Sequence, residues 1–175
     1  MTDHTDDLVI NDKDVLRLWS YNSVSGGRFM NMTNEDAPED GGYIVAANLE
    51  QLPSTNIKFH EVNRFQKLFV MQFEKEDSLY SVNASESSVT AAKIPDKDAA
   101  HFKYYELNPP NMPYVVFPCE NRKIDNQDAY LSCDGAGNMS LKRWNLAGNR
   151  RLPPRAGAMV DPSLLFRVVK PLNNE

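Results

Sequence analysis

Four short strand-like patterns recur along this 175-residue chain, in the same order and at a regular spacing. The second pattern of each set reads RFMNM, LYSVN and YLSCD, and the copies begin at Arg28, Leu79 and Tyr130, which are 51 residues apart. The first patterns read VLRLWS, LFVMQFE and VVFPCE, and the third read YIVAAN, SVTAAKI and MSLKRWN. The fourth patterns, IKFHEV, HFKYYEL and LFRVV, share a Phe near their start. A period of about fifty residues is typical of architectures built from repeated units.

Each pattern is a run rich in Val, Ile, Phe and Tyr that ends at a cluster of turn-forming residues, which indicates β-strands, and helical periodicity is nearly absent. Twelve strands are expected, over residues 15–20, 28–32, 42–48, 57–62, 67–74, 78–83, 88–94, 101–107, 114–120, 129–134, 139–145 and 164–169. Three units of four strands predict an all-β fold of the β-trefoil type, in which six strands close a barrel and three hairpins cover one end. A β-sandwich is the alternative, but it has no need of a threefold register.

We expect one such domain over residues 12–171, preceded by a flexible N-terminal segment (1–11) and followed by a short tail (172–175). Successive strand residues point to opposite faces, so alternation predicts the core. The expected core residues are Leu16, Leu18, Phe29, Ile44, Phe59, Leu68, Val70, Leu79, Val82, Phe102, Tyr104, Val116, Leu131, Leu141, Phe166 and Val168, with Trp144 capping the third hairpin. Loops are expected at residues 33–41, 121–128 and 146–163, where such a scaffold would carry its recognition residues.

Composition narrows the classes of function. The net charge of −5 argues against binding of nucleic acid or heparin as the main activity. The longest apolar runs are strand-sized and too short to span a membrane. The acidic start MTDHTDD lacks the features of a secretory signal, so the chain is expected to stay in the cytosol, to leave by another route or to have lost a leader. Cys119 and Cys133 are expected as reduced thiols if the protein folds in the cytosol, although one bridge between them is possible.

The sequence shows no pattern of catalytic, cofactor-binding or metal-ligating residues. His4, His60 and His101 are not spaced with Cys, Asp or Glu as metal ligands are, and the common nucleophile, phosphate and dinucleotide motifs do not occur. The Gly-rich stretch 134–138 joins two expected strands, so a hairpin turn explains it better than a phosphate site. The chain is therefore interpreted as a binding protein and not an enzyme, with no cofactor.

Several stretches resemble the interleukin-1 family of cytokines. The opening INDKDVLRL (10–18) is similar to the start of the family, where an I-x-D or A-x-D motif runs into the first strand. LYSV with SVT (79–82, 88–90) is similar to the central strand pair, and FKYYELNPP (102–110) to the E-M-N-P-P stretch of interleukin-18. AYLSC with MSL (129–133, 139–141) resembles the late hairpin, and SLLFRV (163–168) the closing strand, as in interleukin-33. The resemblance spans about residues 10–170 in the family's order, with no single close match.

The resemblance implies a monomeric cytokine that is made in the cytosol and released to the extracellular space without a signal peptide. Its partners would be an interleukin-1-type receptor ectodomain and an accessory chain, both immunoglobulin-like, and it would signal or antagonise inflammation without binding nucleic acid or inserting into a membrane. In parts of the family the active form begins nine residues before the I-x-D motif, and here that position is Met1. The alternative is caspase-type cleavage after Asp12.

The family has no shared motif for receptor contacts, so candidate contacts are chosen by charge. Complementary charge mainly sets the association rate and selectivity of a complex. The candidates are the N-terminal Asp12 and Asp14, the acidic loop residues Glu35, Asp36, Glu39 and Asp40, and the basic loop residues Arg150, Arg151 and Arg155. For each of them the alternative interpretation is a solvated surface charge.

Other trefoil functions stay open at this point. A protease inhibitor could present residues 149–156 (NRRLPPRA) to a trypsin-like enzyme. Ricin-type lectins repeat Q-x-W in each unit, whereas only Lys142-Arg143-Trp144 occurs here, in one unit. A fibroblast-type growth factor would carry a basic heparin patch, which an acidic chain does not favour.

Overall fold

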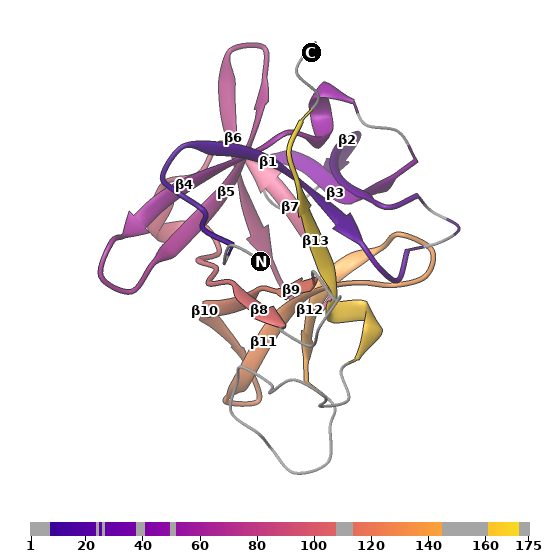
Figure 1. Cartoon of the computed structure of the whole chain (residues 1–175). Coiled ribbons are helices and arrows are strands. Elements are labelled where there is room, and N and C mark those ends of the chain that lie inside the picture. Colours follow the sequence, from indigo (N-terminus) through magenta and orange to yellow (C-terminus); the bar gives the residue numbers. More distant parts are fainter. Residues whose placement is uncertain are drawn as a thin grey trace, which may run out of the picture.

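The computed structural model describes residues 8–23, 25, 27–37, 41–49, 52–107, 114–144 and 161–171. Within these ranges the protein is all-β, as predicted, with three single-turn 3₁₀ helices and no α-helix (Figure 1). The strands are β1 Asp14–Ser20, β2 Phe29–Ala37, β3 Gly42–Asn48, β4 Ile57–Asn63, β5 Leu68–Lys75, β6 Ser78–Ala84, β7 Val89–Ala92, β8 Tyr105–Leu107, β9 Tyr114–Val116, β10 Pro118–Ile124, β11 Gln127–Cys133, β12 Met139–Arg143 and β13 Phe166–Val169. The 3₁₀ helices are η1 Pro53–Thr55, η2 Asp96–Asp98 and η3 Pro162–Leu164.

Antiparallel pairings connect six segments of the chain into a ring. β1 pairs with β4 on one side and with β13 on the other, and β4 pairs with β5. Phe102 forms isolated β-bridges to Phe69 in β5 and to Cys119 in β10. The residues that follow Phe102 form β8, which pairs with β9. β9 then pairs with β13 and closes the ring. A ring of this kind leaves no unpaired outer strand.

Three further hairpins, β2–β3, β6–β7 and β11–β12, contact one another. β3 and β7 share a short ladder. Ala47 N donates to Gly137 O at 2.8 Å, and Leu141 N donates to Ser85 O at 2.7 Å, so the third hairpin touches the other two. The hairpins therefore form one assembly and do not project separately into solvent.

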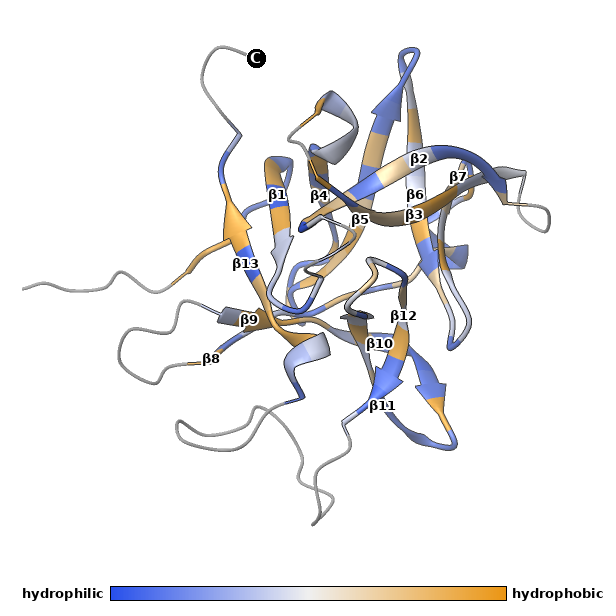
Figure 2. Ribbon diagram, turned by 90° about the vertical axis from the view of Figure 1, so that its right-hand side faces the viewer, coloured by the Kyte–Doolittle hydropathy of each residue, from blue (hydrophilic) through white to orange (hydrophobic). Residues whose placement is uncertain are grey.

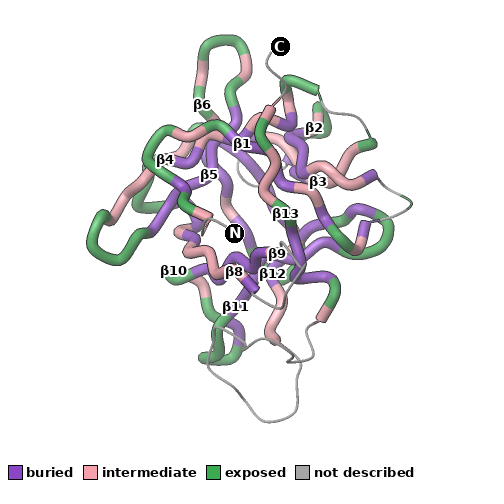
Figure 3. The backbone as a smooth tube through the Cα atoms, viewed as in Figure 1, coloured by how far each residue is buried: buried purple, intermediate pink, exposed green. Residues whose placement is uncertain are grey.

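The core is built around a run of aromatic rings. Phe59 lies 6.0 Å from Phe69 and 6.4 Å from Phe117, and Phe117 lies 5.9 Å from Phe166, measured between ring centroids. All four side chains are buried. Apolar segments of the strands converge on this centre, while the hairpin tips are hydrophilic and exposed (Figures 2 and 3).

Most of the predicted core is confirmed. The buried members are Leu16, Leu18, Phe59, Leu68, Val70, Val82, Phe102, Val116, Leu131, Leu141 and Phe166. Tyr104 and Val168 are partly buried and pack against the core, and Trp144 is partly buried with its ring 5.5 Å from that of Tyr130. The predicted capping position of Trp144 on the third hairpin agrees with this contact.

Three core assignments were wrong. Leu79 is 41% exposed, because it lies three residues from the buried Val82 in one strand and therefore faces the other way. Phe29 and Ile44 are only partly buried, and their neighbours Met30 and Val45 occupy the interior instead. A shift of one residue exchanges the two faces of a strand, and the pairing of β2 with β3 fixes that choice here.

The described residues form thirteen strands, whereas twelve were predicted. The expected strand 114–120 is divided at Phe117, since β9 pairs with β8 and β13 whereas β10 pairs with β11. Two expected loops also differ from the prediction. Residues 33–37 continue β2, which carries an irregularity between Met32 and Asp36, and residues 121–128 are a tight hairpin turned by Asp125 and Asn126, both with positive φ.

The Gly-rich stretch after β11 is a hairpin turn, as predicted. Asp134 Oδ1 accepts hydrogen bonds from the backbone N–H groups of Ala136 and Asn138, each at 2.9 Å. Gly137 adopts a φ of 95°, a conformation that favours glycine. Although burial raises the pKa of Asp134, the hydrogen bonds that its carboxylate accepts outweigh this effect and hold the pKa below its usual value.

Candidate functional site

The segment that leads into β1, residues 8–14, is fastened to the barrel, and we call it the lead-in segment. Ile10 is buried, and its N–H donates to the hydroxyl of Tyr104 at 3.0 Å. Lys13, with a φ of 71°, donates its N–H to Phe59 O at 2.7 Å. These contacts join the lead-in segment to Tyr104 and to β4.

Asp12 lies at the surface of this segment, beside a histidine. Its Oδ1 accepts a hydrogen bond from Glu61 N at 2.9 Å and lies 3.7 Å from His60 Nδ1. His60 Nε2 lies 2.9 Å from Asp96 Oδ2, so one imidazole connects the lead-in segment to η2. The hydrogen bond from Glu61, aided by the nearby His60, holds the pKa of Asp12 below its usual value. Asp12 is therefore an anion at neutral pH.

The other acidic candidates that the structure describes lie in different surroundings. Asp14 is half-buried, and its Oδ2 accepts from Asn11 N at 2.8 Å, so it stabilises the turn before β1. Glu35 and Asp36 are exposed on β2, where Asp36 stands opposite Tyr43 on β3. They belong to a paired strand and not to the predicted loop, and the strand pairing fixes their backbone.

The remaining candidates lie outside the described residues: Glu39, Asp40, Arg150, Arg151 and Arg155. The residues that frame the predicted basic loop are described. Lys142 Nζ on β12 lies 2.6 Å from Asp161 Oδ2, and Asp161 also caps η3 by accepting from Ser163 N at 3.0 Å. Although burial raises the pKa of Asp161, the hydrogen bonds from Lys142 and Ser163 outweigh it and hold the pKa below the usual value.

The two cysteines are free thiols and both are buried. Burial raises the pKa of Cys119 to about 11 and also raises that of Cys133, so both stay protonated at neutral pH and neither is an activated nucleophile. Among the residues with described positions, no group of three or more His, Cys, Asp or Glu is arranged to hold a metal ion. No helix in the same part of the chain is long and apolar enough to cross a membrane.

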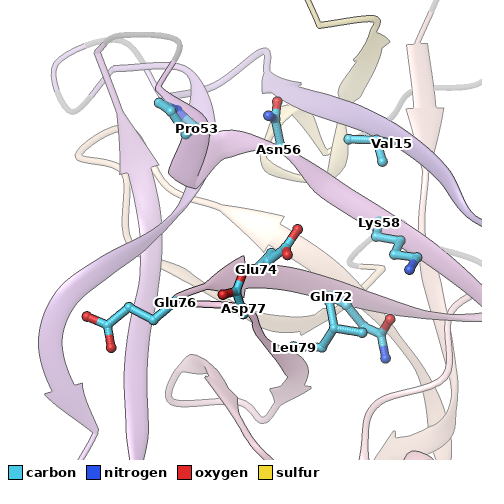
Figure 4. A pocket seen from close by; sticks show the side chains of 9 residues that line it. All are labelled: Val15, Pro53, Asn56, Lys58, Gln72, Glu74, Glu76, Asp77 and Leu79. Atoms are coloured by element: carbon cyan, nitrogen blue, oxygen red, sulfur yellow. The ribbon is translucent and has the colours of Figure 1, made fainter. Parts of the chain in front are cut away.

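A groove of about 360 Å³ runs along the β5–β6 hairpin as far as its turn, and we call it the acidic groove (Figure 4). It is lined by Val15, Pro53, Asn56, Lys58, Gln72, Glu74, Glu76, Asp77 and Leu79. Three stretches of the chain supply these residues: β1, η1 with the start of β4, and the β5–β6 hairpin with its turn. The groove begins one residue after Asp14, so it adjoins the lead-in segment.

Sequence reasoning did not find the acidic groove. Val15 and Leu79 look like ordinary strand residues, and Leu79 was expected in the core. Their exposed fractions, 45% and 41%, are high for apolar strand residues. The alternation of side chains along β6 could have shown the exposure of Leu79, because Leu79 and Val82 cannot face the same side of one regular strand.

No protein-family model matches this chain, and no curated protein sequence is significantly similar to it.

Proposed function

We propose that this chain is a β-trefoil cytokine of the interleukin-1 type, which binds a pair of immunoglobulin-like receptor chains. The observation that carries the proposal is the closed ring of six strand segments together with three hairpins in mutual contact. A trefoil requires both. Buried residues of the three hairpins recur at nearly the same spacing, with Met30, Val82 and Leu131 lying 52 and then 49 residues apart.

The lead-in segment supports the cytokine type within that fold. The I-x-D motif falls on Ile10 and Asp12, where the first residue is buried and the second is exposed. This arrangement gives both motif residues a physical role: the apolar one anchors the segment, and the anion is presented at the surface. The exposed anions Glu35 and Asp36 on β2 would add to an acidic recognition surface.

The proposal includes synthesis in the cytosol and release without a signal peptide, which fits two buried, unbridged thiols. Release that continues when transport from the endoplasmic reticulum is blocked would support this route. Release that stops under the block would contradict it.

Binding to a panel of interleukin-1-type receptor ectodomains, presented singly and in pairs, tests the main proposal. We expect nanomolar binding to at least one of them. The variant Asp12→Asn with Glu35→Gln and Asp36→Asn should lower the association rate more than it raises the dissociation rate, because exposed charges act mainly on diffusional encounter. Asp128→Asn, on the β10–β11 hairpin, removes a single charge elsewhere on the surface and is the control for Asp12→Asn alone. A panel in which no ectodomain binds would reject the proposal.

A further inference from the structure

Aromatic and arginine side chains gather on the outer surface of three neighbouring strands, β1, β13 and β9, which follow one another in this order in the sheet (Figure 1). We call this surface the Trp19 face, and it is made of Trp19, Tyr21, Arg28, Tyr114 and Arg167. Leu18 and Ser20, on either side of Trp19, are buried, whereas Trp19 is partly exposed and points away from the core. Arg167 stands opposite Trp19 in the pairing of β1 with β13 and therefore shares its outer surface.

Two tyrosines extend the Trp19 face towards β9. The rings of Tyr21 and Tyr114 meet edge to face, with their centroids 5.3 Å apart. Phe166 and Val115 pair across β13 and β9 and are both buried, so the next residue of each strand, Arg167 and Tyr114, faces outward. Tyr21 is 42% exposed, and Tyr114 is partly exposed. The surface thus combines aromatic rings and arginines, the side chains that are enriched where proteins bind one another.

The two arginines of the Trp19 face have no carboxylate partner among the residues that the structure describes. Cζ of Arg28 lies 4.6 Å from the centre of the Trp19 ring and Cζ of Arg167 lies 5.5 Å from it, so one indole contacts both cations. Arg28 Nη1 also donates to the carbonyls of Ser20 and Tyr21, at 3.4 and 2.9 Å, which fixes its orientation. The other nitrogens of Arg28, and all those of Arg167, donate to no described residue. Guanidinium N–H groups are therefore held in place and remain available to a ligand.

The chemistry of the Trp19 face favours carboxylates carried by a peptide. A guanidinium group holds a carboxylate through two parallel hydrogen bonds, and contact with an aromatic ring positions the group before the ligand arrives. The net charge of −5 opposes a dense polyanion such as heparin or nucleic acid. The exposed rings, in turn, favour a ligand that also brings an apolar side chain.

We propose that the Trp19 face binds a short acidic segment of a partner protein. Asp or Glu side chains of the segment accept hydrogen bonds from Arg28 and Arg167. An apolar side chain beside them packs on the rings of Tyr21 and Tyr114. The inference goes beyond the proposed function and does not depend on it, because the described contacts considered there are acidic and lie on the lead-in segment and β2.

A selection from a random library of displayed dodecapeptides tests the inference. The whole chain is the target, and the variant Arg28→Gln with Arg167→Gln is used for counter-selection. Enriched peptides should carry Asp or Glu beside Leu, Ile, Phe, Tyr or Trp. A resynthesised peptide should bind the double variant at least about tenfold more weakly than the wild type, because charge-assisted hydrogen bonds are lost. Its affinity for the wild type should fall as salt is added.

Two matched variants separate this surface from a general effect of charge. Arg64→Gln with Lys67→Gln makes the same change in net charge on the β4–β5 turn, which lies near the start of β1, whereas Trp19 lies near its end. This variant should keep the affinity within about twofold of the wild type. Arg28→Lys with Arg167→Lys keeps the charge but removes the planar donors, so it should weaken binding at least about threefold.

A single variant guards against loss of the fold. Arg167 is exposed and makes no hydrogen bond to a described residue, so Arg167→Gln should leave the melting temperature unchanged. The same variant should still weaken the peptide at least about threefold, because one of the two guanidinium groups is gone. An affinity equal to that of the wild type would overturn the inference.

Trp19 itself reports whether the peptide binds at this place. The chain has two tryptophans, so Trp144→Phe leaves Trp19 as the only one. The selected peptide should change the emission of Trp19 in a saturable way, with the Kd found by direct binding. Unchanged emission would contradict the proposed site, and so would a peptide consensus without acidic residues. Binding of a heparin oligosaccharide that requires both arginines, with no acidic peptide enriched, would replace the proposed segment by a polyanion and overturn the inference.

Discussion

Replacement of Phe59 by Ala should be among the most destabilising single changes in this protein. Phe59 is 1% exposed, its ring contacts those of Phe69 and Phe117, and its carbonyl accepts the N–H of Lys13. Truncation of a buried Phe costs about 3–5 kcal/mol. One kcal/mol lowers the melting temperature of a domain of this size by about 2–4 °C, so we expect a decrease of roughly 6–20 °C.

Leu79→Ala is the matched control, because the sequence pattern placed Leu79 in the core and the structure does not. With Leu79 41% exposed, the change should alter the free energy of unfolding by less than about 1 kcal/mol. Urea unfolding followed by circular dichroism measures both free energies. A cost below about 1 kcal/mol for Phe59→Ala, or equal costs for the two variants, would refute the described packing.

Three other predictions concern particular contacts. Asp161→Ala should destabilise the protein by about 1 kcal/mol at neutral pH, since it removes the cap of η3. Because the pKa of Asp161 is lowered in the folded protein, its stabilising effect is present above the ordinary carboxyl pKa and is lost as the pH falls through the folded pKa. The melting temperatures of wild type and variant, measured against pH, should therefore converge in acid. Caspase-1 should not cut after Asp12, because the lead-in segment is hydrogen-bonded to the barrel at Ile10 and Lys13 and would lose these contacts on extending into a protease cleft. A product that begins at Lys13, detected by mass spectrometry, would contradict this prediction. Phe65→Ser at the β4–β5 turn should leave the melting temperature within about 2 °C, because the side chain is 98% exposed, and a larger fall in a thermal melt would show a contact that the structure lacks.

The candidate site was only partly predictable. Asp12 was singled out by a motif, and the structure gives it an exposed position beside His60. His60 also contacts the carboxylate of Asp96, which is 36 residues away in the sequence, and no local sequence pattern predicts that contact. The acidic groove is harder to predict, since its lining comes from three stretches of the chain whose residues look like ordinary strand, turn and surface residues.

The sequence by itself determined the all-β class, the approximate position of most strands and the fifty-residue recurrence, because strand propensity and turn chemistry are local properties. It also marked the shared Phe of the fourth patterns, and Phe59, Phe102 and Phe166 are all buried. Only the tertiary structure decided which face of β2, β3 and β6 turns inward. These strands carry apolar residues on both faces, so alternation alone does not show which face is buried. The pairing with other strands fixes the register and so decides it. The same long-range pairing brings β1, β4 and the β5–β6 hairpin side by side and thereby creates the acidic groove.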